Sequence, residues 1–320
     1  MPTNDLRLLM NLRAPDSLSQ ETYLPTLAAA FLLDRRAQNL TPKTIDFYRN
    51  LLQGFLNWCD VQAIKTVHQL TPDVIRHYLI YLEDKGIKAG GVHARYRTLR
   101  AFLRWYDLEF EPTDFHNPLR KVKPPRVDIE PLEPVPIEHV RAMLATCKTG
   151  KFINERDKVI LLVLLDTGVR AGELLALDRQ DIDTLTGDVV IRKSKSRKPR
   201  IVFLGRQARR ALRTYLRLRK DDTRPLFVAD KGIQKGERLK MAGLRQIILR
   251  RAKQAGVPPP SLHSFRRAFT LAMKRAGADL ITIQKLLGHA DLSQLIRYLA
   301  QTPDDLREAH QRGSPADNLI

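Results

Sequence analysis

The C-terminal half of the chain holds polar residues that interrupt apolar stretches and can carry chemistry. In chain order they are Arg170 and Glu173, then His263 and Arg266, then His289, and finally Tyr298. The members of each of the first two pairs are three residues apart, which places them on one face of a helix. Taken singly, each has an ordinary structural interpretation, such as a surface ion pair, a histidine at a helix end or a core tyrosine.

Taken together, these residues suit phosphoryl transfer on a nucleic acid. Two arginines can hold the non-bridging oxygens of a phosphate by charge-assisted hydrogen bonds. A tyrosine hydroxyl can act as a covalent nucleophile, and two histidines can move protons or hydrogen-bond the phosphoryl oxygens. Lys195 lies in a short basic turn and can protonate a leaving alkoxide.

The sequence has no cluster of carboxylates, or of cysteines and histidines, with metal-ligand spacing, and no nucleotide phosphate loop of the form G-x-x-x-x-G-K-[ST]. We therefore expect no cofactor and no metal, with the arginines supplying the electrostatic stabilisation that a metal ion gives elsewhere.

The charge of the chain points to a polyanionic partner. Its 55 Lys and Arg residues outnumber its 35 Asp and Glu residues, which gives a net charge of +20. Residues 1–110 carry a net charge of only +3, whereas residues 189–220 hold 13 basic residues and no acidic one. Nucleic acid is the commonest partner of such a surface, and a merely solubilising surface is the alternative.

Composition excludes several classes of protein. No apolar run is longer than that of residues 159–165, which is far shorter than the ~20 residues of a membrane span. The N-terminus does not resemble a secretory signal. Two cysteines, Cys59 and Cys147, are too few for a disulfide framework. We expect a protein of the reducing bacterial cytoplasm or nucleoid.

The elements that must position the site divide the chain into four parts. We expect a flexible tail over residues 1–20, an all-helical domain over 21–112, a linker over 113–136 and a second domain over 137–320. In the first domain, Thr41-Pro42 and Thr71-Pro72 are helix start signals, and Gly90-Gly91 precedes a further helix that ends near Trp105. Seven prolines between residues 112 and 136 predict an extended connector, whose basic residues either track a phosphate backbone or are only solvated.

The second domain is predicted to be helical around one β-hairpin. Short strands over residues 189–192 and 200–204 flank the basic turn, and helices are expected over 137–147, 154–166, 206–219, 242–254, 261–276, 279–287 and 292–299. Asp279 is the expected N-cap of one helix, and Gly288 its stop. Beyond Tyr298, Thr302-Pro303 predicts a last short helix from Asp304 to about Gln311.

Four ordered motifs resemble the tyrosine recombinase or phage integrase family, in particular its Xer-like members. They are TGVRAGELLAL (167–177), KSKSRKPRIVFLG (193–205), LHSFRRAF (262–269) and LLGHADLS (286–293), followed by Tyr298. The likeness extends over residues 21–312. It implies a two-domain architecture, with a helical SAM-like core-binding domain and an α+β catalytic domain forming a C-shaped clamp on duplex DNA.

The resemblance also implies a role for each residue. Tyr298 is the expected nucleophile, which forms a 3′-phosphotyrosine and frees a 5′-hydroxyl, while Arg170 and Arg266 stabilise the transition state. The remaining catalytic roles fall to His263, His289 and the general acid Lys195, with Glu173 in support. Lys193 and Lys198 lie close enough to compete for the role of Lys195. Phe265 and Arg267 depart from the leucine and histidine that are usual in the family.

The partner implied is a specific duplex DNA site, bound by four protomers on two duplexes. We expect DNA contacts from six basic residues, namely Arg95, Arg97, Arg100, Lys123, Arg197 and Lys198. Two other classes stay open on residue types alone. A type IB topoisomerase-like enzyme shares this chemistry but relaxes supercoils as a monomer, and a non-catalytic DNA-binding regulator keeps only the basic surface.

Overall fold

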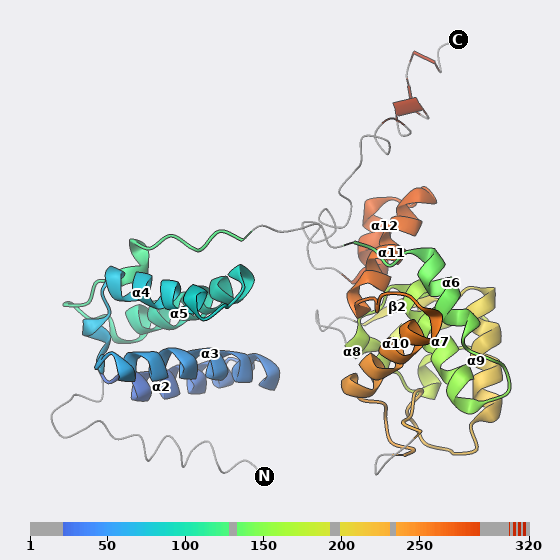
Figure 1. Ribbon diagram of the computed structural model, residues 1–320, viewed down its shortest axis with the longest axis horizontal. Coiled ribbons are helices and arrows are strands. Elements are labelled where there is room, and N and C mark those ends of the chain that lie inside the picture. The colour runs from blue at the N-terminus through green and yellow to red at the C-terminus, as the bar shows by residue number, and fades with distance from the viewer. Residues whose placement is uncertain are drawn as a thin grey trace. The chain divides into compact units, whose positions relative to one another are not determined.

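The computed structural model describes residues 22–127, 133–192, 199–230 and 235–288, together with seven single positions between 307 and 317. Within these ranges the chain is mainly helical and holds one two-stranded antiparallel sheet (Figure 1). It divides into two compact units, residues 1–129 and 130–320. The predicted mainly helical fold with a small hairpin is confirmed, whereas the predicted domain limits remain predictions. None of the described helices has both the length and the apolar character that a membrane span requires.

The described part of unit 1 contains four α-helices. They are α2 (Leu24–Ala37), α3 (Pro42–Val61), α4 (Pro72–Asp84) and α5 (Ala89–Phe110). The Thr41 hydroxyl accepts a hydrogen bond of 3.3 Å from the Thr44 N–H, and the Thr71 hydroxyl accepts one of 3.2 Å from the Val74 N–H. Each threonine satisfies an N–H that the helix leaves without a partner, so the two predicted N-caps are confirmed.

Helix α5 differs from its predicted limits at both ends. It begins at Ala89, so Gly90 and Gly91 lie inside its first turn, and it continues to Phe110. The burial of Val92 and Tyr96 fixes the first turns against the core, and packing of this kind outweighs the low helix propensity of glycine.

Part of the predicted linker belongs to unit 1. Phe115, Leu119 and Val122 are buried with the core of the four helices. The Tyr96 hydroxyl donates a hydrogen bond of 2.8 Å to the Val122 carbonyl and so holds the segment against α5. These three apolar residues, spaced three and four apart among the prolines, explain why the segment packs instead of extending from the helices.

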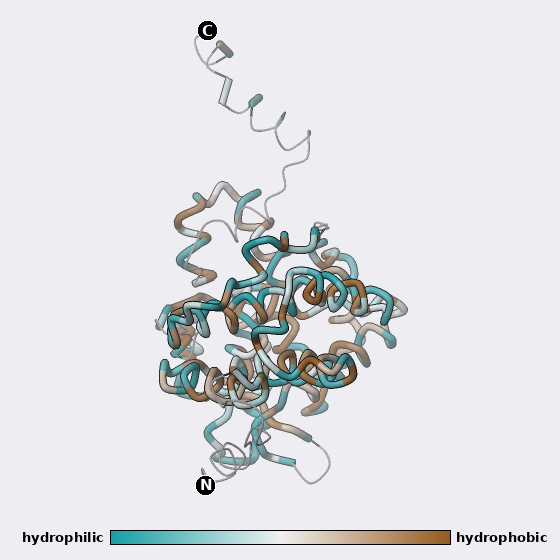
Figure 2. Tube along the Cα trace, turned by 90° about the vertical axis from the view of Figure 1, so that its left-hand side faces the viewer, coloured by the Kyte–Doolittle hydropathy of each residue, from teal (hydrophilic) through white to brown (hydrophobic). Residues whose placement is uncertain are grey.

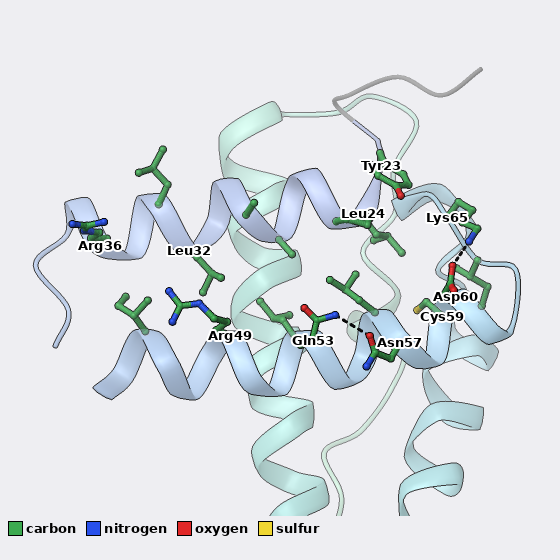
Figure 3. Close-up of a pocket in the computed structure, with 18 residues that line it drawn as sticks. Tyr23, Leu24, Leu32, Arg36, Arg49, Gln53, Asn57, Cys59, Asp60 and Lys65 are labelled. Carbon is green, nitrogen blue, oxygen red and sulfur yellow. Dashed lines mark hydrogen bonds and ion pairs between the residues drawn. The ribbon is translucent and has the colours of Figure 1, made fainter. Parts of the chain in front are cut away.

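A groove of about 440 Å³ lies between α2 and α3 (Figure 3). Its walls are mainly apolar, with Arg36 and Arg49 toward one end and an ion pair between Lys65 and Asp60 at the other. Cys59 lines it, and burial raises the pKa of this thiol to about 12, so the thiol stays protonated and unreactive. None of the residues predicted for catalysis lines the groove.

Unit 2 is built around one buried helix. Its elements are α6 (Ile137–Ala145), α7 (Phe152–Thr167), α8 (Ala171–Ala176), β1 (Asp188–Ile191), β2 (Arg200–Phe203), α9 (Arg206–Leu218), α10 (Met241–Ala255), α11 (Leu262–Arg275) and α12 (Leu280–Leu287). Helix α7 contacts α6, α8, α9, α11 and β2. It carries the apolar run of residues 159–165, and it is buried almost all round, as such a run requires. Figure 2 shows hydrophobic and hydrophilic residues interspersed along the chain.

The hairpin lies against the helices that carry the candidate catalytic motifs. Strands β1 and β2 pair antiparallel, and Ile191 faces Arg200 at the end of the ladder nearest the basic turn. Strand β2 contacts α7 and α12. The Asp279 carboxylate accepts a hydrogen bond of 2.9 Å from the Thr282 N–H, and Gly288 ends α12, so both predicted boundaries of this helix are confirmed.

Candidate active site

The turn between α7 and α8 lies directly against α11 and α12. Gly168 ends α7 with a φ of +58°, a left-handed conformation that favours glycine. A Cβ atom at this position would lie 2.6 Å from the Phe269 ring on α11 and 3.0 Å from the Leu287 side chain on α12. The turn therefore requires glycine both for its backbone and for the approach of α11 and α12.

Arg170 lies two residues later and caps α8 instead of lying on it. Its backbone is extended, with φ −69° and ψ 148°, and Glu173 occupies the third position of the helix. The Glu173 carboxylate accepts hydrogen bonds of 2.9 Å from both the backbone N–H and the guanidinium of Arg170. The expectation that the two residues share a helix face is therefore wrong for Arg170, because the glutamate reaches back to the helix start in the geometry of a capping box.

Arg200, at the start of β2, is the residue that the sequence analysis missed. Its Nη1 and Nη2 donate hydrogen bonds of 3.1 and 2.7 Å to the two oxygens of Glu173, and its Nε donates one of 2.8 Å to the Leu286 carbonyl on α12. Burial by itself raises the pKa of Glu173, but the bonds and charge of Arg200, together with Arg170, outweigh it. The net pKa of Glu173 is lowered, so the carboxylate stays ionised.

Arg266, on α11, joins the same elements from the other side. Its Nη1 and Nη2 donate hydrogen bonds of 2.6 Å to the carbonyls of Gly168 and Leu287, and it is only 1% exposed. The last carbonyls of a helix lack intrahelical partners, and a cation at this end interacts favourably with the negative end of the helix dipole. Arg200 and Arg266 together therefore fix the C-terminal turn of α12.

These bonds close a ring around the candidate site. The ring passes from Arg170 to Glu173, through Arg200 to α12, and through Arg266 back to the turn before Arg170. We call these four side chains the arginine–glutamate ring. Strand β2 and helices α8, α11 and α12 are each tied to it.

His263 lies one turn before Arg266 at the exposed start of α11. Partial removal from water lowers the pKa of its imidazole, and the positive charges of Arg267, Arg266 and Arg170 lower it further. The imidazole is therefore neutral at neutral pH and can accept a proton or a hydrogen bond.

Two family models match the sequence. The phage integrase family matches residues 135–304, and the phage integrase N-terminal SAM-like domain matches residues 31–109. Tyrosine recombinase XerC of Oceanobacillus iheyensis is 30% identical over 310 residues, which cover 93% of this chain and 97% of that protein. Tyrosine recombinase XerA of Thermococcus kodakarensis is 27% identical over 281 residues, 88% of this chain and 92% of that protein.

The chain belongs to the phage integrase family. It is a tyrosine site-specific recombinase, as its motifs predict. Its fold resembles the Tn1549 transposon integrase in complex with a circular intermediate DNA, with a TM-score of 0.73 at 18% identity over 91% of this chain and 99% of that one. It also resembles the XerH recombinase bound to a palindromic difH substrate, with a TM-score of 0.69 at 20% identity over 98% and 94% of the two chains.

Several of the residues predicted for this integrase site lie outside the described part of the chain. They are Lys193, Lys195, Arg197 and Lys198 in the hairpin turn, His289 and Tyr298. Arg200 comes two residues after the gap in the hairpin turn, and Leu287, whose carbonyl bonds to Arg266, comes two residues before His289. The predicted helices over 292–299 and from Asp304 to about Gln311 fall wholly or largely outside the described residues as well.

A second tyrosine of unit 2, Tyr215, has a packing role in the structure. It is fully buried on α9, and its hydroxyl donates a hydrogen bond of 2.9 Å to the Leu226 carbonyl. Burial raises its pKa. A hydroxyl held in the core in this way cannot reach a DNA phosphate.

The structure also describes the two residues that depart from the family pattern and four of the six residues predicted to contact DNA. Phe265 is fully buried in the core, and Arg267 is buried and donates a hydrogen bond of 3.3 Å to the Glu133 carbonyl. Of the residues predicted to contact DNA, Arg97, Arg100 and Lys123 are exposed, whereas Arg95 is half-buried and bonds to the Gly91 carbonyl at 3.1 Å. Exposed basic residues also line α9, at Arg206, Arg210, Arg213 and Arg217.

Proposed function

We propose that this integrase-family recombinase cleaves and rejoins duplex DNA through a covalent bond between Tyr298 and the 3′ phosphate of the cut strand. The observation that carries the proposal is the arginine–glutamate ring. It holds Arg170 and Arg266 around one turn, with the neutral imidazole of His263 beside them. Two guanidinium groups can hold the phosphate oxygens, and a neutral imidazole can accept the proton of an attacking hydroxyl.

The proposed reaction conserves the phosphodiester bond energy. The Tyr298 oxygen attacks phosphorus while the bond to the 5′ oxygen breaks, and His263 accepts the tyrosine proton or positions the phosphate. Lys195 gives a proton to the departing 5′ oxygen, and Arg170, Arg266 and His289 stabilise the charge on the non-bridging oxygens. A 5′-hydroxyl then attacks the phosphotyrosine and restores both the DNA strand and the tyrosine, so the reaction needs no nucleotide and no metal ion.

The proposed substrate is duplex DNA, to which both units bind. The net charge of +20 and the exposed Arg97, Arg100 and Lys123 support it, as do the DNA complexes of the structural relatives. We propose that four protomers bring two duplexes together, because exchange between two duplexes cuts and rejoins four strands and each strand needs its own tyrosine. This function places the protein with DNA in the bacterial cytoplasm.

Covalent capture tests the proposal. The protein and its Tyr298→Phe variant are incubated in EDTA with fragments of genomic DNA from the source organism, denatured in SDS, and recovered with any DNA still attached. The unaltered protein should retain fragments that share one short sequence, whereas the variant should bind DNA before denaturation but retain none.

Two results would contradict the proposal. Capture of DNA by the Phe variant would show that Tyr298 is not the nucleophile, and a requirement for Mg²⁺ would show that the arginines do not suffice. Relaxation of supercoiled plasmid by a monomer, with no shared sequence in the captured DNA, would identify a topoisomerase instead.

A further inference from the structure

We propose that Arg200 is a positioning residue for strand cleavage. Its guanidinium group fixes the position of Arg170, through Glu173, relative to the end of α12. The proposal rests on the function proposed above. All three nitrogens of Arg200 bond to protein atoms, two to the Glu173 carboxylate and one to the Leu286 carbonyl. Its side chain is only 9% exposed, and these partners are the groups through which we expect it to act.

The Glu173 carboxylate links Arg200 to Arg170. It accepts two hydrogen bonds from each of these residues, so its position depends on both. A bidentate arginine–carboxylate pair fixes the plane of the carboxylate as well as its distance. The rotamer of Arg170, which is a quarter exposed at the candidate site, is therefore set in part by a residue 30 positions further along the chain.

The bond from Arg200 to α12 reaches the second half of the site. Leu286 is the penultimate residue of α12, and Gly288 follows with a φ of +64°. A Cβ atom on Gly288 would lie 3.0 Å from both Cδ and Nη1 of Arg200, so the arginine fills the space under this turn. The next residue in the sequence is His289, a predicted catalytic residue, so Arg200 bonds to the backbone three positions before it.

Arg200 also ties the hairpin to these two elements. It is the first residue of β2 and comes five positions after Lys195 in the sequence. One side chain therefore joins the strand that follows the basic turn, the helix that begins beside Arg170 and the helix that ends before His289. Misplacement of a reacting group by about 1 Å can cost on the order of 10²-fold in rate, so loss of this contact should slow chemistry more than DNA binding.

The test compares Arg200→Gln, Arg200→Lys, Glu173→Gln and the double variant Arg200→Gln/Glu173→Gln. The rate constant of covalent complex formation is measured in single-turnover reactions at saturating DNA, alongside DNA affinity and the thermal midpoint. A rate constant reports the geometry of folded molecules, whereas loss of folded protein lowers only the amplitude. We expect Arg200→Gln to lower the rate constant by about 10- to 100-fold with affinity nearly unchanged, and Arg200→Lys to recover part of the loss.

The double variant identifies the route of the effect. If Arg200 acts through Glu173, the double variant should be about as slow as the slower single variant, because the two residues act as one unit.

Arg238→Gln is the matched control. Arg238 also bonds to backbone carbonyls of the α8 region, those of Leu175 and Leu177, but its bonds to described residues do not include Arg170 or α12. This control should lower the thermal midpoint and leave the rate constant unchanged.

Three outcomes would overturn the inference: a parental rate constant in Arg200→Gln, losses that multiply in the double variant, or an equal slowing in Arg238→Gln. If Arg200→Gln does not fold, Arg200→Lys and Glu173→Gln decide, because a role in positioning predicts a slowed rate constant in each. Failure of the unaltered protein to form a covalent complex would instead contradict the proposed function.

Discussion

Arg266 donates a hydrogen bond of 2.6 Å to the Gly168 carbonyl, and so joins the helix that carries His263 to the turn that carries Arg170. Arg266 and Gly168 are 98 positions apart in the sequence. Arg266 is buried, whereas the Arg170 side chain is a quarter exposed. The two arginines therefore differ in how much they contribute to the fold, although both are proposed to act on the same phosphate.

This difference predicts distinct effects of removing each arginine. Arg170→Ala should lower the cleavage rate by roughly 10²–10³-fold, the cost of losing one transition-state donor, with little effect on stability. Arg266→Ala should lower cleavage at least as much and should also destabilise unit 2 by on the order of 2–4 kcal/mol, because two buried carbonyls lose their partner. Thermal unfolding and single-turnover cleavage measure the two quantities. Equal losses of DNA affinity and cleavage would show that the arginines only bind DNA.

The lowered pKa of His263 predicts a shifted pH dependence. Its neutral form is proposed to accept the proton of the nucleophile, so cleavage should fall on acidification with a midpoint below the ordinary histidine value of 6.5. Arg267→Gln should raise the pKa of His263 by removing a nearby positive charge, and Arg267→Lys should keep it low. NMR titration of the His263 ring and the pH–rate profile measure the same midpoint. A midpoint at or above 6.5 in the unaltered protein would contradict the account.

The exposed arginines of α5 predict a salt-dependent loss of DNA affinity. Arg97→Gln/Arg100→Gln should weaken binding to all DNA sequences, and the slope of log affinity against log salt should fall by about 0.9 for each lost phosphate contact. Cleavage at saturating DNA should not change. The control Lys43→Gln/Lys85→Gln removes the same charge from exposed positions on other parts of unit 1. An equal change of slope in the control would show that only net charge matters.

Local sequence signals predicted the helices and the hairpin because they act through near neighbours. Thr41, Thr71 and Asp279 each cap a helix by bonding an N–H three residues on, and Gly288 ends α12 through its own backbone conformation. The burial of α7 follows equally from its apolar run.

The ring could not be predicted in this way, since its contacts are long-range. In the sequence, Arg200 resembles the other basic residues around the hairpin turn. Its partners Glu173 and Leu286 lie 27 and 86 positions away. Arg170 was placed on a helix because spacing alone does not distinguish a helix face from a cap. Leu119 and Val122 lie in the core of unit 1. This was not predicted, because the prolines around them indicated an extended linker.

The chain beyond Tyr298 gives a prediction about assembly. If the segment predicted to be helical from Asp304 to about Gln311 docks on a neighbouring protomer, truncation after Ala300 should leave single-site DNA binding nearly intact and abolish the complex with two duplexes. Gel shifts with one and two DNA sites measure both. A large fall in the thermal midpoint, with recombination lost in proportion to folded protein, would show that the segment stabilises its own unit instead.

The most direct test of the account is to identify the residue that carries the DNA. Covalent complexes trapped in SDS are digested with nuclease and trypsin, and the peptide that bears the residual nucleotide is sequenced by mass spectrometry. Cleavage after Arg297 and Arg307 releases a peptide of residues 298–307 in which Tyr298 is the only tyrosine. The account predicts the nucleotide on Tyr298, and a nucleotide on any other residue would contradict it.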